Sequence, residues 1–173
     1  MREPPPYAGE VITIDAAAAE AMWEEYCKAH PDRHHDTESP PAEYFGDSPE
    51  MADELLEAVI GGPKRATAAL VAEFADGDEE LPRIGSHWIC CDGSGRPRLV
   101  MRSVELRIGP VSSVDEAFAY DEGEGERTRE WWLDAHSGYW QRSCARMGLE
   151  FSDTMEAVFE RFVVVWPPEH ADE

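Results

Sequence analysis

The amino-acid sequence predicts an α+β fold, and three observations lead to this prediction. Strand patterns and helix patterns are intermixed along the chain but do not alternate regularly, which favours α+β over a doubly wound parallel sheet. The chain has 173 residues, a length that suits one domain. Hydrophobic residues make up 42% of it, enough to bury a core without disulfides or metals.

Two helices are predicted in the first third of the chain. Asp15 can cap the first helix, which ends before Pro31. Ser48 then precedes Pro49, an N-cap residue followed by proline at the first helical position. An apolar stripe with helical spacing follows, made of Met51, Leu55, Leu56 and Val59. Residues 61–63, Gly-Gly-Pro, end this helix, and the proline-rich polar stretch between the two helices is expected to be a loop.

The middle of the chain is predicted to contain a short helix and a pair of strands. Residues 67–75 have helical character with Thr67 at their start, and the acidic stretch 76–82 is expected to be a loop. Residues 84–92 are typical of a strand and residues 97–108 of its partner, since a turn sequence rich in glycine joins them.

Two further helices and a last strand are predicted toward the C-terminus. Residues 113–116 have the spacing of a capping box, which opens a helix through Tyr120. A long helix over residues 128–147 is closed by Gly148. Residues 157–166 are strongly β-prone and are followed by two prolines, which end the strand.

The composition favours a cytoplasmic protein without membrane contact. No apolar run approaches the roughly 20 residues that a membrane helix needs. The N-terminal sequence MREPPPYAGE lacks the apolar core of a signal peptide. The cysteines form no CxxC motif and are expected to be buried thiols in a reducing compartment; they are Cys27, Cys90, Cys91 and Cys144.

The charge of the chain argues against a long polyanionic partner. The net charge is −22, and a uniform field of that sign repels nucleic acid. The acidic residues are concentrated outside residues 83–110, where five arginines face two acids for a local charge of 5 − 2 = +3. This charge favours a small, uncharged ligand over a long polyanion, and we expect no DNA partner. The sequence leaves the oligomeric state open.

The segment GGPKRATA, residues 61–68, is the first candidate for chemistry. Lys64 is one of only two lysines among fifteen basic residues, and lysine, unlike arginine, can lose its proton when desolvated. Lys64 could hold a phosphate, a carbonyl oxygen or a carboxylate, or act as a base. Thr67 could be a nucleophile beside such a base. The alternative is a helix junction with a surface lysine and a capping threonine.

The acidic loop EGEGE, residues 122–126, is the second candidate. Its glycines allow close backbone approach, and they flank Glu122 and Glu124. Either carboxylate could be a general acid or base, a metal ligand, or the acceptor for the amino group of a nucleobase. An exposed turn without a role is the alternative.

The helix REWWLDAHSGYWQRS, residues 129–143, is the third candidate. Aromatic residues and arginine can stack on bases, each contributing about 1–3 kcal/mol. Core packing is the simpler interpretation for Trp132 and Trp140, and a hydrogen-bonded core position is the simpler one for His136. The possible ligand contacts on this helix are Trp131, His136, Tyr139 and Arg142.

Other motifs give no further candidate. His30, His34 and His35 lie with Asp32 and Asp36 on the first loop, but without an established metal-ligand spacing. Nucleotide-binding glycine motifs, HExxH and the signatures of serine or cysteine nucleophiles are absent from the sequence. We therefore assign no metal ligand from the sequence.

Four segments together resemble the ASCH domain family, which is PUA-like. In chain order they are FGDSPEMADELLEAVIGGPKRATAAL, RPRLVMRSVELRIGPV, FAYDEGEGERTREWWLDAHSGYW and FERFVVVW, over roughly residues 40–166. The resemblance implies a small β-barrel with flanking helices over residues 40–168. Residues 1–39 then form an N-terminal helical extension and loop like that of longer bacterial members, and residues 169–173 form a tail.

The resemblance also implies a function. Family members are thought to bind RNA or nucleoside-like ligands, and one branch hydrolyses N4-acetylcytidine with a Lys, a Thr and a Glu. Lys64 and Thr67 match that Lys and Thr, and Glu122 or Glu124 matches the Glu. The family motif often has Arg two residues after the Thr, where this chain has Ala69.

Three functions stay open on this basis. The first is hydrolysis of a modified nucleoside. The second is cleavage of single-stranded RNA with the help of a divalent metal, manganese or magnesium, which longer family members are reported to perform. The third is binding of RNA by a regulator without turnover. The further side chains expected to contact the ligand are Tyr44, Phe45, Arg65, Arg102 and Ser103.

Overall fold

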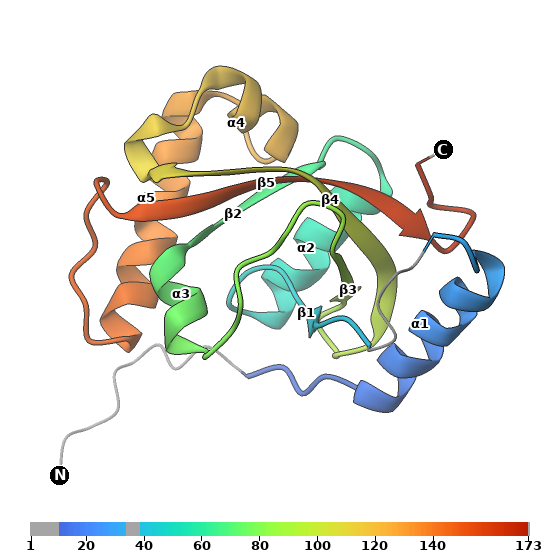
Figure 1. Ribbon diagram of the computed structural model, residues 1–173. Coiled ribbons are helices and arrows are strands. Elements are labelled where there is room, and N and C mark those ends of the chain that lie inside the picture. Colours follow the sequence, from blue (N-terminus) through green and yellow to red (C-terminus); the bar gives the residue numbers. More distant parts are fainter. Residues whose placement is uncertain (1–10, 34–38, 173) are drawn as a thin grey trace, which may run out of the picture. The chain divides into compact units, whose positions relative to one another are not determined.

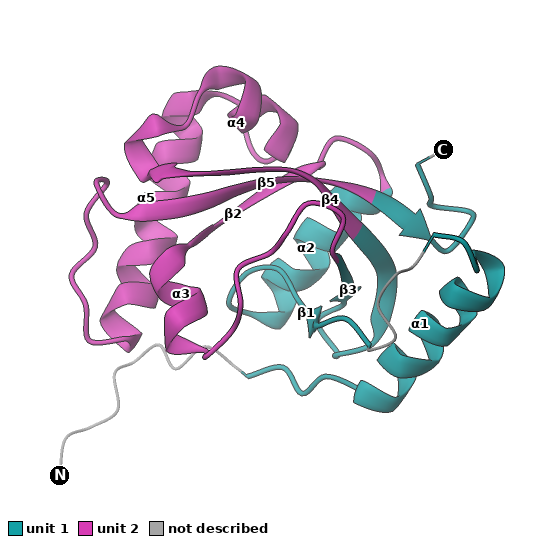
Figure 2. Ribbon diagram, viewed as in Figure 1, with its two compact units in different colours: residues 1–60, 87–101, 164–173 teal, residues 61–86, 102–163 magenta. Residues whose placement is uncertain are grey.

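The computed structural model describes residues 11–33 and 39–172 and has the α+β fold expected from the sequence (Figure 1). The chain divides into two compact units (Figure 2). The first comprises residues 1–60, 87–101 and 164–173, and the second residues 61–86 and 102–163. Within the described residues, no helix combines the length and the apolar character needed to cross a membrane.

The first unit contains α1 (Ala16–Ala29), β1 (Ala42–Glu43), α2 (Pro49–Ile60) and β3 (His87–Cys91). Both helices begin where the sequence predicts. The Asp15 carboxylate accepts the Ala18 N–H at 3.0 Å, and the Ser48 hydroxyl accepts the Met51 N–H at 3.1 Å. Trp23 and Tyr26 of α1 pack into a buried cluster with Ile89 and Cys91 of β3 and with Val100.

The second unit contains β2 (Ala66–Leu70), α3 (Val71–Asp76), the 3-10 turn η1 (Val111–Ser113), α4 (Glu116–Glu122) and α5 (Arg129–Arg146). Its core lies between the strands and the helices. Trp132 and Trp140 of α5 are buried there with Phe118 of α4 and with Phe159, which confirms the core interpretation of both tryptophans.

Two long strands, β4 (Pro97–Pro110) and β5 (Glu156–Trp166), run through both units. The strand order is β1-β3-β4-β5-β2, with β2 antiparallel to β5 and β1 parallel to β3. In the described part of the chain the edge strands β1 and β2 do not pair with each other. The sheet is therefore open, and the expected closure into a barrel is wrong, whereas the α+β class is confirmed.

Two local predictions are wrong. Residues 66–70 form β2 rather than the start of a helix, because all five pair in register with Arg161 to Ala157 of β5, and this pairing outweighs helical propensity. The helix over Glu116–Glu122 is capped by Asp115, whose carboxylate accepts the Phe118 N–H at 2.8 Å, rather than by Ser113. The Ser113 hydroxyl instead donates to the Pro110 carbonyl oxygen.

The cysteines behave as buried thiols. All four are free; Cys90, Cys91 and Cys144 are buried, and Cys27 is partly buried. Burial, together with the charges of Asp92 and Asp15, raises the pKa of Cys91 to about 11. This thiol is therefore protonated at neutral pH.

Candidate functional site

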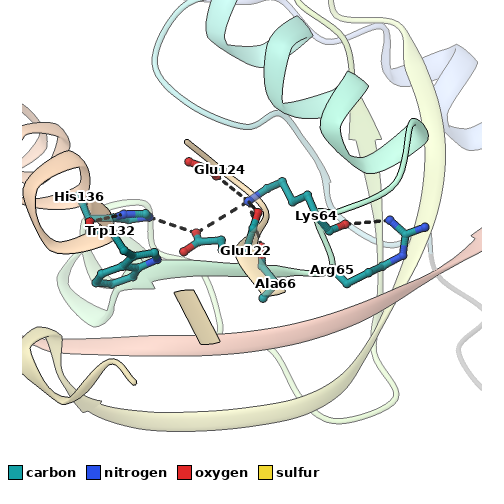
Figure 3. A network of polar contacts seen from close by, with 7 residues as sticks. All are labelled: Lys64, Arg65, Ala66, Glu122, Glu124, Trp132 and His136. Carbon is teal, nitrogen blue, oxygen red and sulfur yellow. Dashed lines mark hydrogen bonds and ion pairs between the residues drawn. The ribbon is translucent and has the colours of Figure 1, made fainter. Parts of the chain in front are cut away.

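Lys64 lies in the second unit, directly before β2, and its side chain is only 1% exposed. Its ammonium nitrogen Nζ donates to Glu124 Oε1 at 2.7 Å, to the Ala66 carbonyl oxygen at 2.9 Å and to the Glu122 carbonyl oxygen at 3.4 Å (Figure 3). Glu122 Oε1 forms an ion pair with Nζ at 3.8 Å. Three acceptors thus match the three N–H donors of an ammonium group, which keeps the buried charge satisfied.

Gly123 allows the two acidic residues to approach Lys64. It ends α4 in the left-handed conformation with φ of 69°. A Cβ atom at this position would lie 2.6 Å from the backbone N of Lys64 and 2.6 Å from the carbonyl carbon of Pro63. Only glycine fits this contact, and it places Glu122 and Glu124 on either side of the ammonium group.

A second glycine shapes the next turn of the loop. Gly125 has φ of 53°, and a Cβ atom there would lie 2.0 Å from Cε2 of Trp131. The half-buried Trp131 indole, one of the expected ligand contacts, therefore packs directly on the backbone of the acidic loop.

His136 connects Glu122 to α5. Its Nε2 lies 3.1 Å from Glu122 Oε1, and its Nδ1 lies 2.9 Å from the Trp132 carbonyl oxygen (Figure 3). The imidazole stacks on the Trp132 indole, with ring centroids 3.9 Å apart and planes inclined by 16°. The expected hydrogen-bonded position of His136 is thus confirmed, and its partner is one of the candidate carboxylates.

The carboxylates around His136 favour its protonated form. Burial by itself lowers the pKa of His136, but the charge of Glu122, the hydrogen bond to Glu122 and the charge of Glu124 outweigh burial. The pKa of the imidazole is therefore raised above its ordinary value.

Two polar atoms of this network are buried without a hydrogen-bond partner. They are Oε2 of Glu122, an acceptor, and Nε1 of Trp132, a donor. Buried polar atoms without partners are rare in folded proteins, and each one calls for an explanation. Glu124 is the more accessible carboxylate, since its side chain is 17% exposed and that of Glu122 is 2% exposed.

Thr67 lies on the face of β2 that points away from the core of the second unit. Ala66, Ala68 and Leu70 pack toward the core of the second unit, and side chains alternate along a strand, so Thr67 points to the opposite face. Its cross-strand neighbour is Glu160, which accepts a hydrogen bond from the Ser103 hydroxyl. Ser103 and Glu160 are both buried.

Glu160 was not among the candidate residues predicted from the sequence. Its only signal was an acidic residue inside the apolar strand segment FERFVVVW.

The other residues expected to contact the ligand differ in burial, in hydrogen-bond partners and in the unit to which they belong. The Arg65 guanidinium donates to the Lys64 carbonyl oxygen at 2.8 Å, and Arg142 donates to the Gly138 carbonyl oxygen at 3.3 Å. Tyr139 packs against the core of the second unit, and Arg102 is half-buried on β4. Tyr44 and Phe45 belong to the first unit, where Phe45 is buried with its ring 5.4 Å from that of Trp88.

The site does not fit a divalent metal ion. The Lys64 ammonium already occupies the position of a cation between the two carboxylates, at 2.7 and 3.8 Å. Among residues 11–33 and 39–172, no three His, Cys, Asp or Glu side chains converge as metal ligands do. His34, His35 and Asp36 of the first loop lie outside the described residues. We therefore derive no step through a metal ion.

Comparisons with known proteins agree with the fold. The sequence matches the ASCH domain family over residues 42–166. A crystal structure of a protein from Enterococcus faecalis V583 is similar, with 30% sequence identity, a TM-score of 0.78, and coverage of 86% of this chain and 88% of that chain. An ASCH domain from Lactobacillus crispatus JV V101 has 26% identity, a TM-score of 0.78, and coverage of 87% and 96%. Among curated proteins, none matches.

Replacing Gly123 by alanine should destabilise the protein more than the same change at Gly148. Both glycines have positive φ, 69° and 73°, so both variants carry the strain of a left-handed alanine, about 1–2 kcal/mol. A Cβ at Gly148 meets nothing within 4 Å, whereas one at Gly123 overlaps the backbone of residues 63 and 64. We expect Gly123→Ala to cost a further ~1–3 kcal/mol from overpacking. Urea unfolding measures both; equal losses would contradict the close approach.

The stabilisation that His136 provides should depend on pH. A folded-state pKa raised above the ordinary value of about 6.5 gives stability that is fully present below that value and is lost as pH rises through the folded pKa. The unfolding free energy lost in His136→Gln should therefore be larger at about pH 6 than at about pH 9. Packing on Trp132 is lost equally at both values. A difference that is constant or grows with pH would show that the imidazole is not held protonated.

Proposed function

Because the chain belongs to the ASCH domain family, we propose that it hydrolyses the N-acyl group of a modified nucleoside such as N4-acetylcytidine at the Lys64 site. The family is generally associated with RNA binding. The observation that carries the proposal is the buried ammonium of Lys64, held between the carboxylates of Glu122 and Glu124. Ammonium, carboxylate and imidazole groups converging in one buried place are suited to acid–base chemistry on an amide.

Glu124 is the group through which a ligand can enter this network. Its carboxylate is a partly exposed acceptor of Lys64, and it lies on the glycine-flanked loop. When Glu124 turns from Lys64 toward a ligand, one N–H of the ammonium becomes available to the acyl oxygen. That N–H then stabilises the negative charge that develops on this oxygen during hydrolysis.

The reaction balances with one water molecule. The water oxygen bonds to the acyl carbon, and one of its protons passes to the Glu124 carboxylate. The carbon–nitrogen bond then breaks, and Glu124 returns the proton to the leaving amino nitrogen. The second water proton leaves with the carboxylic acid product. In this mechanism Lys64 is the oxyanion partner and stays charged, while Glu124 acts as base and then as acid.

Charge supports a neutral ligand over a long RNA. The net charge of −22 opposes a polyanion. Two arginines near the loop are engaged internally: Arg127 donates to the Tyr120 carbonyl oxygen at 2.9 Å, and Arg129 donates to the Val114 and Ser112 carbonyl oxygens, each at 2.7 Å. A nucleoside therefore suits this region better than a phosphate chain.

Ligand binding without turnover is the second candidate. It is favoured by the complete set of acceptors around Lys64, which also stabilises a structural ammonium group. Ala69, at the position where the family motif often has Arg, points the same way.

The test is turnover of N4-acetylcytidine, followed by chromatography of cytidine and acetate. We expect Lys64→Ala to lower turnover by about 10²–10³-fold, the usual loss of an oxyanion-stabilising donor. Lys28→Ala is the matched control, since Lys28 is the only other lysine and its side chain is 77% exposed. Because Lys64→Ala removes a buried cation from beside two carboxylates, Glu124→Gln serves as a second variant that keeps the ammonium group.

The outcomes separate the candidates. Turnover that survives in both variants contradicts the mechanism. Binding of N4-acetylcytidine without product, lost in Lys64→Ala, identifies a binding protein instead. Fragments of single-stranded RNA that form only with manganese would favour the ribonuclease.

A further inference from the structure

The contacts of His136 determine how many protons it carries. Its Nδ1 lies 2.9 Å from the Trp132 carbonyl oxygen, and a carbonyl oxygen only accepts hydrogen bonds. Nδ1 must therefore carry a hydrogen. In a neutral imidazole the other nitrogen, Nε2, would then present a lone pair.

That lone pair would face another one. Nε2 lies 3.1 Å from Glu122 Oε1, which as a carboxylate oxygen is also only an acceptor. The contact needs one proton, held either by His136 as an imidazolium or by Glu122 as a carboxylic acid. The Lys64 ammonium lies 3.8 Å from the same Oε1 and forms an ion pair with Glu122 as a carboxylate. The proton therefore belongs on His136.

We infer that His136 is held as an imidazolium by Glu122, and that it is a positioning residue that sets the net charge of the Lys64 site. The groups that face the site are Lys64 from the loop before β2, Glu122 at the end of α4 and Glu124 from the loop that follows. With the imidazolium these groups and His136 sum to zero, two cations against two carboxylates. Without it the site carries a charge of −1.

This charge matters for the proposed hydrolysis, and this part of the inference rests on the function proposed above. An oxyanion on the acyl group forms beside the Lys64 ammonium more readily at a neutral site than at one that is already negative. Loss of the His136 proton should therefore slow the reaction although His136 does not touch the acyl group.

The proton count itself can be measured without any substrate. The ¹⁵N chemical shifts of the imidazole ring nitrogens distinguish an imidazolium from each of the two neutral tautomers. The chain has six histidines, and the signal missing in His136→Gln assigns the residue. We expect both ring nitrogens of His136 to be protonated at about pH 7, where an ordinary histidine is mostly neutral.

Glu122→Gln is the decisive variant. Its amide can donate to Nε2, so His136 should become neutral at about pH 7 with the hydrogen on Nδ1, the tautomer that the Trp132 carbonyl oxygen requires. Glu124→Gln removes a charge but keeps the contact between His136 and Glu122. The titration midpoint of His136 should therefore fall less in Glu124→Gln than in Glu122→Gln. If His136 is neutral at this pH in the wild-type protein, or if Glu122→Gln leaves its titration unchanged, the inference is wrong.

The predicted effect on activity can be tested separately from the protonation state of His136. For the hydrolase, kcat/KM should fall as pH rises through the titration midpoint of His136, and in His136→Gln it should be low and lack that step. If no hydrolysis is found while the titration is as expected, the proposed function fails and the imidazolium stands. If hydrolysis is found without this step, the positioning role is wrong.

Discussion

The arrangement of the second unit depends on one requirement, the satisfaction of a buried ammonium group. Lys64 is 1% exposed, and a charge taken out of water at this depth must be surrounded by acceptors. Those acceptors come from three places: the carbonyl of Ala66 in β2, the end of α4 and the loop after it. The close packing of Gly123 on residues 63 and 64 brings these segments together.

The same requirement ties α5 to the site. Glu122 contacts both Lys64 and His136, and it therefore links the buried ammonium group to α5. The other buried side chains of α5 belong to the hydrophobic core. The stack of His136 on Trp132 is where this polar network and the core meet. Core packing therefore positions His136 beside the candidate catalytic carboxylates.

The sequence predicted the helices well where local signals act. Asp15 and Ser48 cap helices as expected, because a cap acts within one turn. The prediction was wrong at β2, because the alanines of this segment favour a helix. They form a strand only by pairing with β5, which lies about ninety residues away in the sequence. Lys64, Glu122, Glu124 and His136 were all candidates, but their convergence was not predictable from spacing. The family resemblance placed Thr67 with them. In the structure Thr67 lies on the face of β2 that points away from the core of the second unit.

The central claim, that the Lys64 network is the ligand site, can be tested on the lysine side chains directly. The chain has two lysines, so protein labelled with ¹⁵N-lysine contains two ammonium groups. Lys64 is buried and bonded to three acceptors, whereas the Lys28 side chain is 77% exposed, and this difference separates their signals. On titration with cytidine and N4-acetylcytidine, we predict that the Lys64 ammonium signal shifts while that of Lys28 does not. Saturating ligand that leaves the Lys64 signal unchanged would contradict the account.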